Sequence, residues 1–179
     1  MIITISGYPG SGKTTVADFL ARRLNLKRYS GGDFMRELAR KKGISLLELS
    51  KKAEKSSEVD REIDKMYKKL QREDNFVIDS RLGFMFLPNS IKIFLSVNPK
   101  IGAKRIFKQG RGIEKENTTL AKTLENIKRR EKSERLRYKK YYGISIDDLS
   151  NYDIIIDTST MNEEEENNSV LRAIKKFTY

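Results

Sequence analysis

A glycine-rich stretch close to the N-terminus carries the residue types that bind nucleotide phosphates. Residues 7–14 read GYPGSGKT and match the P-loop pattern G-x-x-x-x-G-K-[ST] at every fixed position. In such a loop the glycines let backbone N–H groups surround phosphate oxygens, and the start of the following helix adds positive partial charge. Lys13 would reach the β- and γ-phosphates, and the Thr14 hydroxyl would bind Mg²⁺. The pattern therefore predicts a site for a nucleoside triphosphate and magnesium.

The segments around this loop must hold it in shape. Residues 2–5 form a short apolar run that is typical of a buried strand, and residues 14–24 carry apolar side chains at helical spacing. Further short runs rich in β-branched residues predict strands at 76–78, 91–97 and 154–156, with a brief one around 28–29. Strands that alternate with helical segments predict an α/β fold with a parallel sheet.

Polar residues fall at the carboxyl ends of the predicted strands, where parallel sheets bind their ligands. They include Ser30, Asp79 and Asp157. An acid in this place would hold a water molecule bound to Mg²⁺, and spacing alone does not choose between the two aspartates. We favour Asp79, because Arg81 lies two residues further on and the last strand comes late in the chain.

Residues 31–74 do not fit a simple alternation of strands and helices. Their pattern is helical throughout and predicts three helices, broken near 43–45 and 56–57. Ser45 with Glu48 forms a capping-box pattern, and Ser57 is a candidate cap for the third helix. A single crossover needs fewer residues, so we expect a small helical insertion over the site.

A second interruption, at residues 108–117, separates helical patterns at 99–107 and 118–142. Glycines flank Arg111 in this segment, which suits a lid that closes on substrate. An ordinary connection between two helices is the alternative. We take residues 108–115 as the candidate lid.

Arginines gather beside the predicted strand ends and in the two interruptions. The planar guanidinium binds phosphate through two hydrogen bonds and keeps its charge at every physiological pH. Arg130 and Arg137 lie seven residues apart on one predicted helix and therefore share a face of it. The set is Arg36, Arg81, Arg105, Arg111, Arg130 and Arg137.

The composition limits the chemistry that this chain can perform. Cysteine and histidine are absent, so carboxylates, lysines, arginines and a bound metal ion must do the work. No apolar run approaches the ~20 residues of a membrane-spanning helix. The net charge of +12 would suit a nucleic-acid-binding protein, but no known recognition module is visible, and most lysines alternate with acids as on solvated helix faces.

Five blocks of the sequence, in order, resemble the cytidylate kinase family of P-loop nucleoside monophosphate kinases, in its short archaeal form. Besides the P-loop they are SGGDFMR at 30–36, VIDSRLGF at 77–84, KIFLSV at 92–97, IKRREKSERLR at 127–137 and IIIDTS at 154–159. The resemblance covers most of the chain. It departs from the family pattern at Ser80, where a glycine is usual, and at Ser133, where related bacterial enzymes often carry an arginine.

The resemblance implies a role for each matching position. The implied catalytic residues are Lys13, Arg81, Arg130 and Arg137. The implied ATP-binding residues are Gly7, Tyr8, Pro9, Gly10, Ser11, Gly12, Lys13, Thr14, Thr15, Arg105, Arg111, Thr158 and Ser159. The implied acceptor-binding residues are Ser30, Asp33, Arg36, Arg81, Arg130, Glu134 and Arg137. Thr14 and Asp79 would serve the metal, and ATP and Mg²⁺ are the implied cofactors.

These observations predict a single P-loop NTPase domain with three α/β/α layers and a mostly parallel five-stranded sheet. Its core would comprise residues 1–30, 75–107 and 116–179, with the monophosphate-binding insertion at 31–74 and the lid at 108–115. The predicted reaction transfers the γ-phosphoryl group of ATP to CMP or dCMP. We expect a cytoplasmic monomer whose partners are small nucleotides, and neither a membrane nor a nucleic acid.

Three alternative functions stay open at this point. The first is a kinase for AMP, UMP, shikimate or a nucleoside, although arginines on the acceptor side favour a phosphorylated acceptor. The second is a GTP-dependent switch, against which the absence of an N-K-x-D stretch counts. The third is a basic nucleic-acid-binding protein with a vestigial P-loop, which would bind in a salt-sensitive manner and transfer no phosphoryl group.

Overall fold

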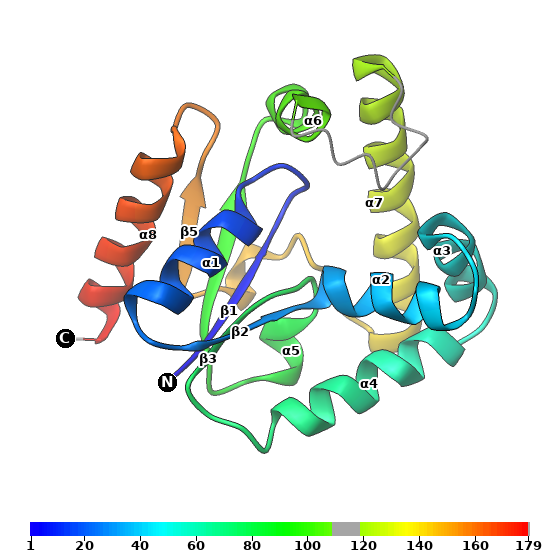
Figure 1. Ribbon diagram of the computed structural model, residues 1–179, viewed down its shortest axis with the longest axis horizontal. Helices are drawn as coiled ribbons and strands as arrows, with labels where there is room; N and C mark the ends of the chain where they lie inside the picture. Colours follow the sequence, from blue (N-terminus) through cyan, green and yellow to red (C-terminus); the bar gives the residue numbers. More distant parts are fainter. Residues whose placement is uncertain (109–118, 179) are drawn as a thin grey trace.

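Five parallel strands form one sheet at the centre of the computed structural model, which describes residues 1–108 and 119–178 (Figure 1). The strands lie in the order β2-β3-β1-β4-β5. Their bounds are Ile2–Gly7 for β1, Lys27–Ser30 for β2, Phe76–Asp79 for β3, Ile91–Ser96 for β4 and Ile154–Asp157 for β5. Every strand expected from the sequence is present, and the predicted parallel α/β class is confirmed.

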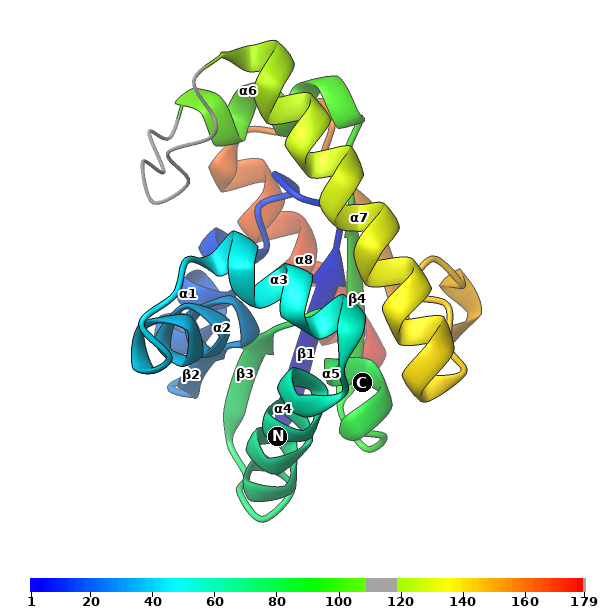
Figure 2. The ribbon, with the colours of Figure 1, turned by 90° about the vertical axis from the view of Figure 1, so that its right-hand side faces the viewer.

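Helices cover both faces of this sheet, so the predicted three layers are confirmed. Helix α1 and helix α8 lie on one side, and α2 to α5 and α7 lie on the other (Figures 1 and 2). The helix bounds are Lys13–Arg23 for α1, Gly31–Lys41 for α2, Leu46–Lys55 for α3, Glu58–Leu70 for α4, Gly83–Phe86 for α5, Pro99–Lys108 for α6, Leu120–Tyr142 for α7 and Glu163–Thr178 for α8.

Alternation along the strands divides the apolar core into two parts. Val77 of β3 packs with Val16 and Leu20 of α1 on one face. Its neighbours Phe76 and Ile78 point the other way and pack with side chains of α4 and α7. Successive side chains of a strand face opposite sides, so a strand buried on both faces is apolar at nearly every position. This is why the strands read as continuous apolar runs in the sequence.

The segment after β2 forms three helices, α2, α3 and α4, as predicted. The Ser45 hydroxyl accepts a hydrogen bond from the Glu48 N–H, and the Glu48 carboxylate accepts one from the Ser45 N–H, so the predicted capping box is confirmed. The expected cap at Ser57 is wrong: its side chain makes no capping hydrogen bond. Its ψ of 6° is a turn conformation, whereas a capping side chain needs an extended backbone to reach the next N–H groups.

Helix α7 is the longest helix of the described residues and carries two of the six candidate arginines, Arg130 and Arg137. It begins after Thr119, whose hydroxyl accepts from the Lys122 N–H at 3.2 Å, and it ends at Gly143 in the left-handed conformation. Most of the predicted lid, including Arg111, lies outside the described residues. No helix within the described ranges is long and apolar enough to cross a membrane.

Candidate active site

The P-loop connects the end of β1 to the start of α1. Gly12 precedes the helix with a φ of +85°, a conformation that side chains rarely adopt, and a Cβ there would lie 2.2 Å from the Glu166 carboxylate. Gly12 stands at the N-cap of α1 and has no side chain that could accept a hydrogen bond from the helix. The first N–H groups of α1 are therefore not taken up by a capping side chain and can bind an anion.

Lys13 folds back on its own loop. Its Nζ donates to the backbone oxygen of Gly7 at 3.0 Å and to that of Tyr8 at 2.6 Å. Burial, followed by the nearby charge of Arg81, holds the pKa of Lys13 well below its usual value, although Asp79 and Glu134 oppose this. A phosphate group would favour the charged lysine, so the site is electrostatically prepared for an anion.

The structure brings Asp79, and not Asp157, to the start of α1. The Thr14 hydroxyl donates to Asp79 Oδ2 at 3.1 Å, and Asp79 is buried at the end of β3. Asp157 instead accepts hydrogen bonds from the backbone and hydroxyl of Ser159, at 3.0 and 2.6 Å, at the exposed end of β5. Hydroxyl and carboxylate oxygens are ligands that suit Mg²⁺, so the Thr14–Asp79 pair fits the ion that the motif predicts.

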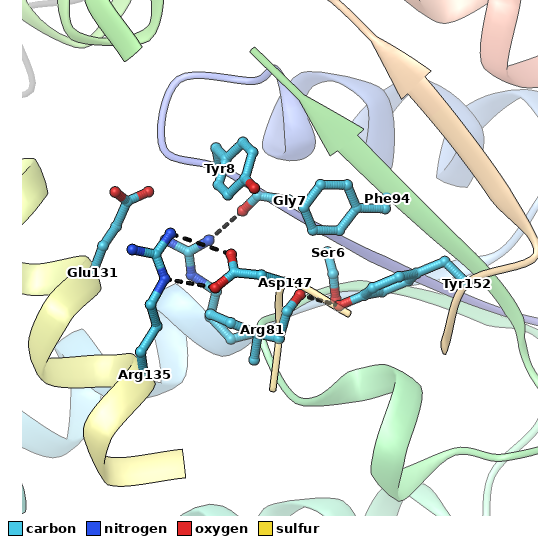
Figure 3. A pocket seen from close by; sticks show the side chains of 10 residues that line it. Ser6, Gly7, Tyr8, Arg81, Phe94, Glu131, Arg135, Asp147 and Tyr152 are labelled. Atoms are coloured by element: carbon cyan, nitrogen blue, oxygen red, sulfur yellow. Dashed lines mark hydrogen bonds and ion pairs between the residues drawn. The ribbon is translucent and has the colours of Figure 1, made fainter. Parts of the chain in front are cut away.

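A carboxylate with two arginines joins α7 to the P-loop. Glu134 pairs with Arg81 Nε at 3.0 Å and with Arg130 Nε at 2.9 Å. Arg81 also donates to the Gly7 backbone oxygen, a contact drawn in Figure 3. Burial alone would raise the pKa of Glu134, but Arg81 and Arg130 bring it down to about 2. Three of the predicted acceptor residues thus form one cluster beside the loop that holds Lys13.

Arg137 is held by the helical insertion. Its Nε lies 3.4 Å from Asp60 Oδ1 on α4, and its Nη2 donates to the Tyr138 hydroxyl at 3.1 Å. Both partners of the ion pair are almost fully buried, with 7% of Arg137 and 3% of Asp60 exposed. The sequence did not single out Asp60, since an acid on a helix rich in charged residues gives no local signal.

Arg105, predicted to bind ATP, contacts the P-loop, the turn after β5 and helix α8. It donates to the backbone oxygens of Gly10, Thr158 and Met161, the last at 2.7 Å. It also pairs with Glu166 at 2.8 Å. Glu166 is buried against Gly12, a contact that nothing in the sequence pattern indicates. Ser159 accepts a hydrogen bond from the Asn98 N–H at 2.8 Å.

The remaining predicted acceptor residues lie at the start of α2. The Ser30 hydroxyl accepts from the Asp33 N–H at 3.2 Å and so caps the helix, and Asp33 pairs with Arg36. Ser30 lies beside Asp79 in the register of β2 and β3. This places the start of α2 next to the Thr14–Asp79 pair.

A small pocket opens behind the loop, between β1, α7 and the segment before β5 (Figure 3). Tyr8 reaches into it, with its ring centroid 5.2 Å from that of Phe94. Arg135 of α7 binds Asp147 through two hydrogen bonds, at 2.6 and 3.2 Å. The Tyr8 side chain therefore packs against the core behind the P-loop. The P-loop motif alone could not indicate this packing.

A P-loop at the head of a parallel sheet, with an arginine-bearing helix beside it, defines a kinase of the P-loop class. Solved structures with this fold include shikimate kinase from Acinetobacter baumannii in complex with shikimate, with a TM-score of 0.62 and 17% identity over 98% of this chain and 93% of that one. Shikimate kinase from Aquifex aeolicus gives a TM-score of 0.59 and 19% identity, over 99% and 98%. At these identities the likeness concerns the fold alone.

The chain belongs to the cytidylate kinase-like family, whose model matches residues 2–160. Among its curated relatives is the cytidylate kinase of Sulfurisphaera tokodaii, 42% identical over 92% of this chain and 90% of the relative. The cytidylate kinase of Methanocaldococcus jannaschii is 40% identical over 97% of both chains. The predicted family resemblance is confirmed.

Proposed function

We propose that this protein transfers the γ-phosphoryl group of ATP to CMP or dCMP, giving ADP and CDP or dCDP. Family membership supports the reaction and the acceptor. The observation that carries the proposal is the Arg81–Glu134–Arg130 cluster beside Lys13, because it puts fixed positive charge next to the loop for the triphosphate. Membership of the cytidylate kinase-like family does not favour a GTP-dependent switch or a nucleic-acid-binding module.

The chemistry requires positioning and charge, and no strong base. The attacking oxygen belongs to a phosphate that is already ionised at neutral pH, which agrees with a chain that lacks histidine. Lys13 would leave the Gly7 and Tyr8 oxygens for the triphosphate. Arginines would stabilise the negative charge on the group in transfer. In this step the γ-phosphorus–oxygen bond to ADP breaks while the bond to the acceptor phosphate oxygen forms.

Thr14 and Asp79 would hold the magnesium end of the triphosphate, directly or through water. Mg²⁺, when bound, neutralises charge on the β- and γ-phosphate oxygens. On the acceptor side, Arg36, Arg130 and Arg137 would bind the monophosphate, and Glu134 the ribose. Ser30, Asp33 and Arg81 would lie near the acceptor base or phosphate. These roles, with those of Arg105, Thr158 and Ser159 on the ATP side, rest on the family pattern and on the neighbourhood described above.

An acceptor screen tests this function. We expect coupled measurement of ADP release, with Mg²⁺ and ATP, to give the highest kcat/KM with CMP or dCMP among CMP, dCMP, UMP, AMP and shikimate. Activity with AMP alone would contradict the choice of base. Activity with shikimate alone would contradict the phosphorylated acceptor, and release of ADP without any acceptor would indicate a hydrolase.

Two substitutions test the assigned machinery. We expect Lys13→Ala and Arg137→Ala each to lower kcat by a factor of about 100 or more, since each removes charge that acts on the transferred group. Arg129→Ala, at an exposed position of the same helix, serves as the control and should leave kcat unchanged. Thermal unfolding confirms that each variant folds, and near-normal turnover of a folded Lys13→Ala enzyme would refute the assignment.

The remaining expectations also stay proposals. They are the division of the chain into core, insertion and lid, the monomeric state and the cytoplasmic location. Sedimentation at several protein concentrations tests the oligomeric state. A monomer should show a single mass that does not change on dilution.

A further inference from the structure

An arginine that neither the family pattern nor the motif singles out lies against the magnesium pair. Arg28 stands on β2, and its Nη1 is 2.8 Å from Asp79 Oδ1 on β3. About a fifth of the Arg28 side chain is exposed, and less than a tenth of the Asp79 side chain. The ion pair is therefore largely shielded from water, which makes it stronger than a pair on the surface.

The fold explains why these two residues meet. Arg28 lies opposite Val77 in the register of β2 and β3, and Asp79 follows Val77 by two residues. Residues two apart on a strand point to the same face, so Arg28 and Asp79 are diagonal neighbours within reach of a long side chain. Val77 packs against α1, which places both charges on the face that α1 covers.

Helix α1 completes the arrangement from the other side. Asp18, four residues after Thr14 and on the same face of the helix, lies 2.7 Å from Arg28 Nε. Thr14 donates to Asp79 Oδ2 at 3.1 Å. The four side chains form a chain of contacts, Asp18–Arg28–Asp79–Thr14. Asp79 Oδ2 accepts a hydrogen bond from Thr14, whereas the buried Oδ1 faces the charge of Arg28 without accepting a hydrogen bond.

We propose that Arg28 is a positioning residue for the magnesium end of the site: it occupies Asp79 Oδ1, leaves Oδ2 beside Thr14, and opposes binding of a divalent cation before the nucleotide arrives. The inference rests on the proposed function, since it takes Thr14 and Asp79 as the residues that serve Mg²⁺. The ATP phosphates would bring the negative charge that outweighs Arg28. The ion would then bind as part of the nucleotide complex and not to the empty enzyme.

The test measures Mn²⁺ binding to the whole enzyme without nucleotide, by electron paramagnetic resonance of free Mn²⁺. We expect Arg28→Gln to bind Mn²⁺ about tenfold more tightly than the wild type, because a unit charge a few ångströms from the ion is removed. Arg28→Lys, which keeps the charge, should stay close to the wild type. Arg22→Gln, at an exposed position of α1, removes an equal charge elsewhere and should change nothing.

A double variant tests whether the change in Mn²⁺ affinity depends on Asp79. In Arg28→Gln combined with Asp79→Asn, the gain in Mn²⁺ affinity should disappear, because the carboxylate that Arg28 neutralises is gone. If Arg28→Gln does not fold, Arg28→Met keeps the aliphatic stem and removes the charge. Unchanged Mn²⁺ affinity in a folded charge-free variant, or a gain that persists without Asp79, would overturn the proposal.

The same preparations separate this inference from the proposed function. Phosphoryl transfer to CMP is measured on the wild type in parallel. An active wild type with no change of Mn²⁺ affinity in the Arg28 variants refutes only the role of Arg28. A wild type without transfer to any acceptor refutes the proposed function, and the inference that depends on it falls as well.

Discussion

Single side chains in this site differ in their charge behaviour because their surroundings differ. Lys13 is partly buried beside Arg81, and its desolvation and this neighbouring charge lower its pKa. Glu134 is buried but lies between Arg81 and Arg130, which lower its pKa to about 2. The site thus keeps its carboxylate charged at all physiological pH values, while its P-loop lysine depends on an anion to stay charged at high pH.

Binding of ATP should therefore weaken as the pH rises into the alkaline range. The free enzyme holds the pKa of Lys13 well below 10.5, whereas the triphosphate favours the charged lysine and raises it again. Affinity is complete below the pKa of the free enzyme and is lost as the pH rises through it. Calorimetry in two buffers of different ionisation enthalpy should show proton uptake on binding.

Lys13→Arg provides the control for this pH dependence. Arginine stays charged throughout the range, so the variant should bind ATP with an affinity that does not fall with pH and without proton uptake at this position. A wild type whose ATP affinity is constant between pH 7 and pH 10 would show that Lys13 keeps its proton without the ligand.

Glu134 should contribute to stability in a defined acidic range. Its pKa falls from 4.5 to about 2 in the folded protein, so its contribution is fully present above about pH 4.5 and is lost as the pH falls to about 2. We expect Glu134→Gln to lower the free energy of unfolding at pH 7 by about 2–3 kcal/mol. Urea unfolding should show this difference narrowing between pH 4.5 and pH 2, and a constant difference would contradict the assignment.

At the scale of elements, the helical insertion and α7 are tied together at several points. Asp60 of α4 pairs with Arg137. The Tyr142 hydroxyl at the end of α7 donates to Asp64 at 2.9 Å, and the Ser133 hydroxyl of α7 donates to Glu54 of α3 at 2.5 Å. The insertion therefore positions an arginine that stands on a different element.

We expect Asp60→Asn to lower kcat roughly tenfold through the loss of orientation of Arg137. It should also lower the free energy of unfolding by about 1–3 kcal/mol, since a buried polar contact is weakened. Kinetics and thermal unfolding measure the two effects separately. In the Arg137→Ala background, the same substitution should change kcat little, because residues in contact are not additive. A full tenfold loss in that background would show that Asp60 acts independently of Arg137.

At the scale of the whole molecule, the net charge of +12 belongs to a fold whose proposed substrates are two polyanions. A basic surface of this kind attracts any polyanion at low salt. We expect a labelled ~20-base-pair DNA duplex to bind at ~50 mM salt and to be released by ~200 mM, as purely electrostatic contacts are. Fluorescence anisotropy measures this, and tight binding that survives 200 mM salt would favour the nucleic-acid alternative.

The sequence by itself determined those features that depend on interactions between residues close together in the chain. The P-loop, the five strands, the three insertion helices and the Ser45 capping box depend on neighbouring residues, periodicity and turn chemistry, and all are present as predicted. Ser57 failed as a cap because its backbone adopts a turn conformation instead of an extended one. The four-residue helix α5 has no periodicity that could predict it.

Only the tertiary structure decided which side chains meet. Asp79 and Asp157 follow equally apolar strands, and the sheet order brings the first to Thr14 and leaves the second exposed at an edge. Arg28, Asp60 and Glu166 carry no local signal, because their partners lie 51, 77 and 61 positions away along the chain. Such contacts depend on strand register and helix packing, and neither is encoded by the residues next to them.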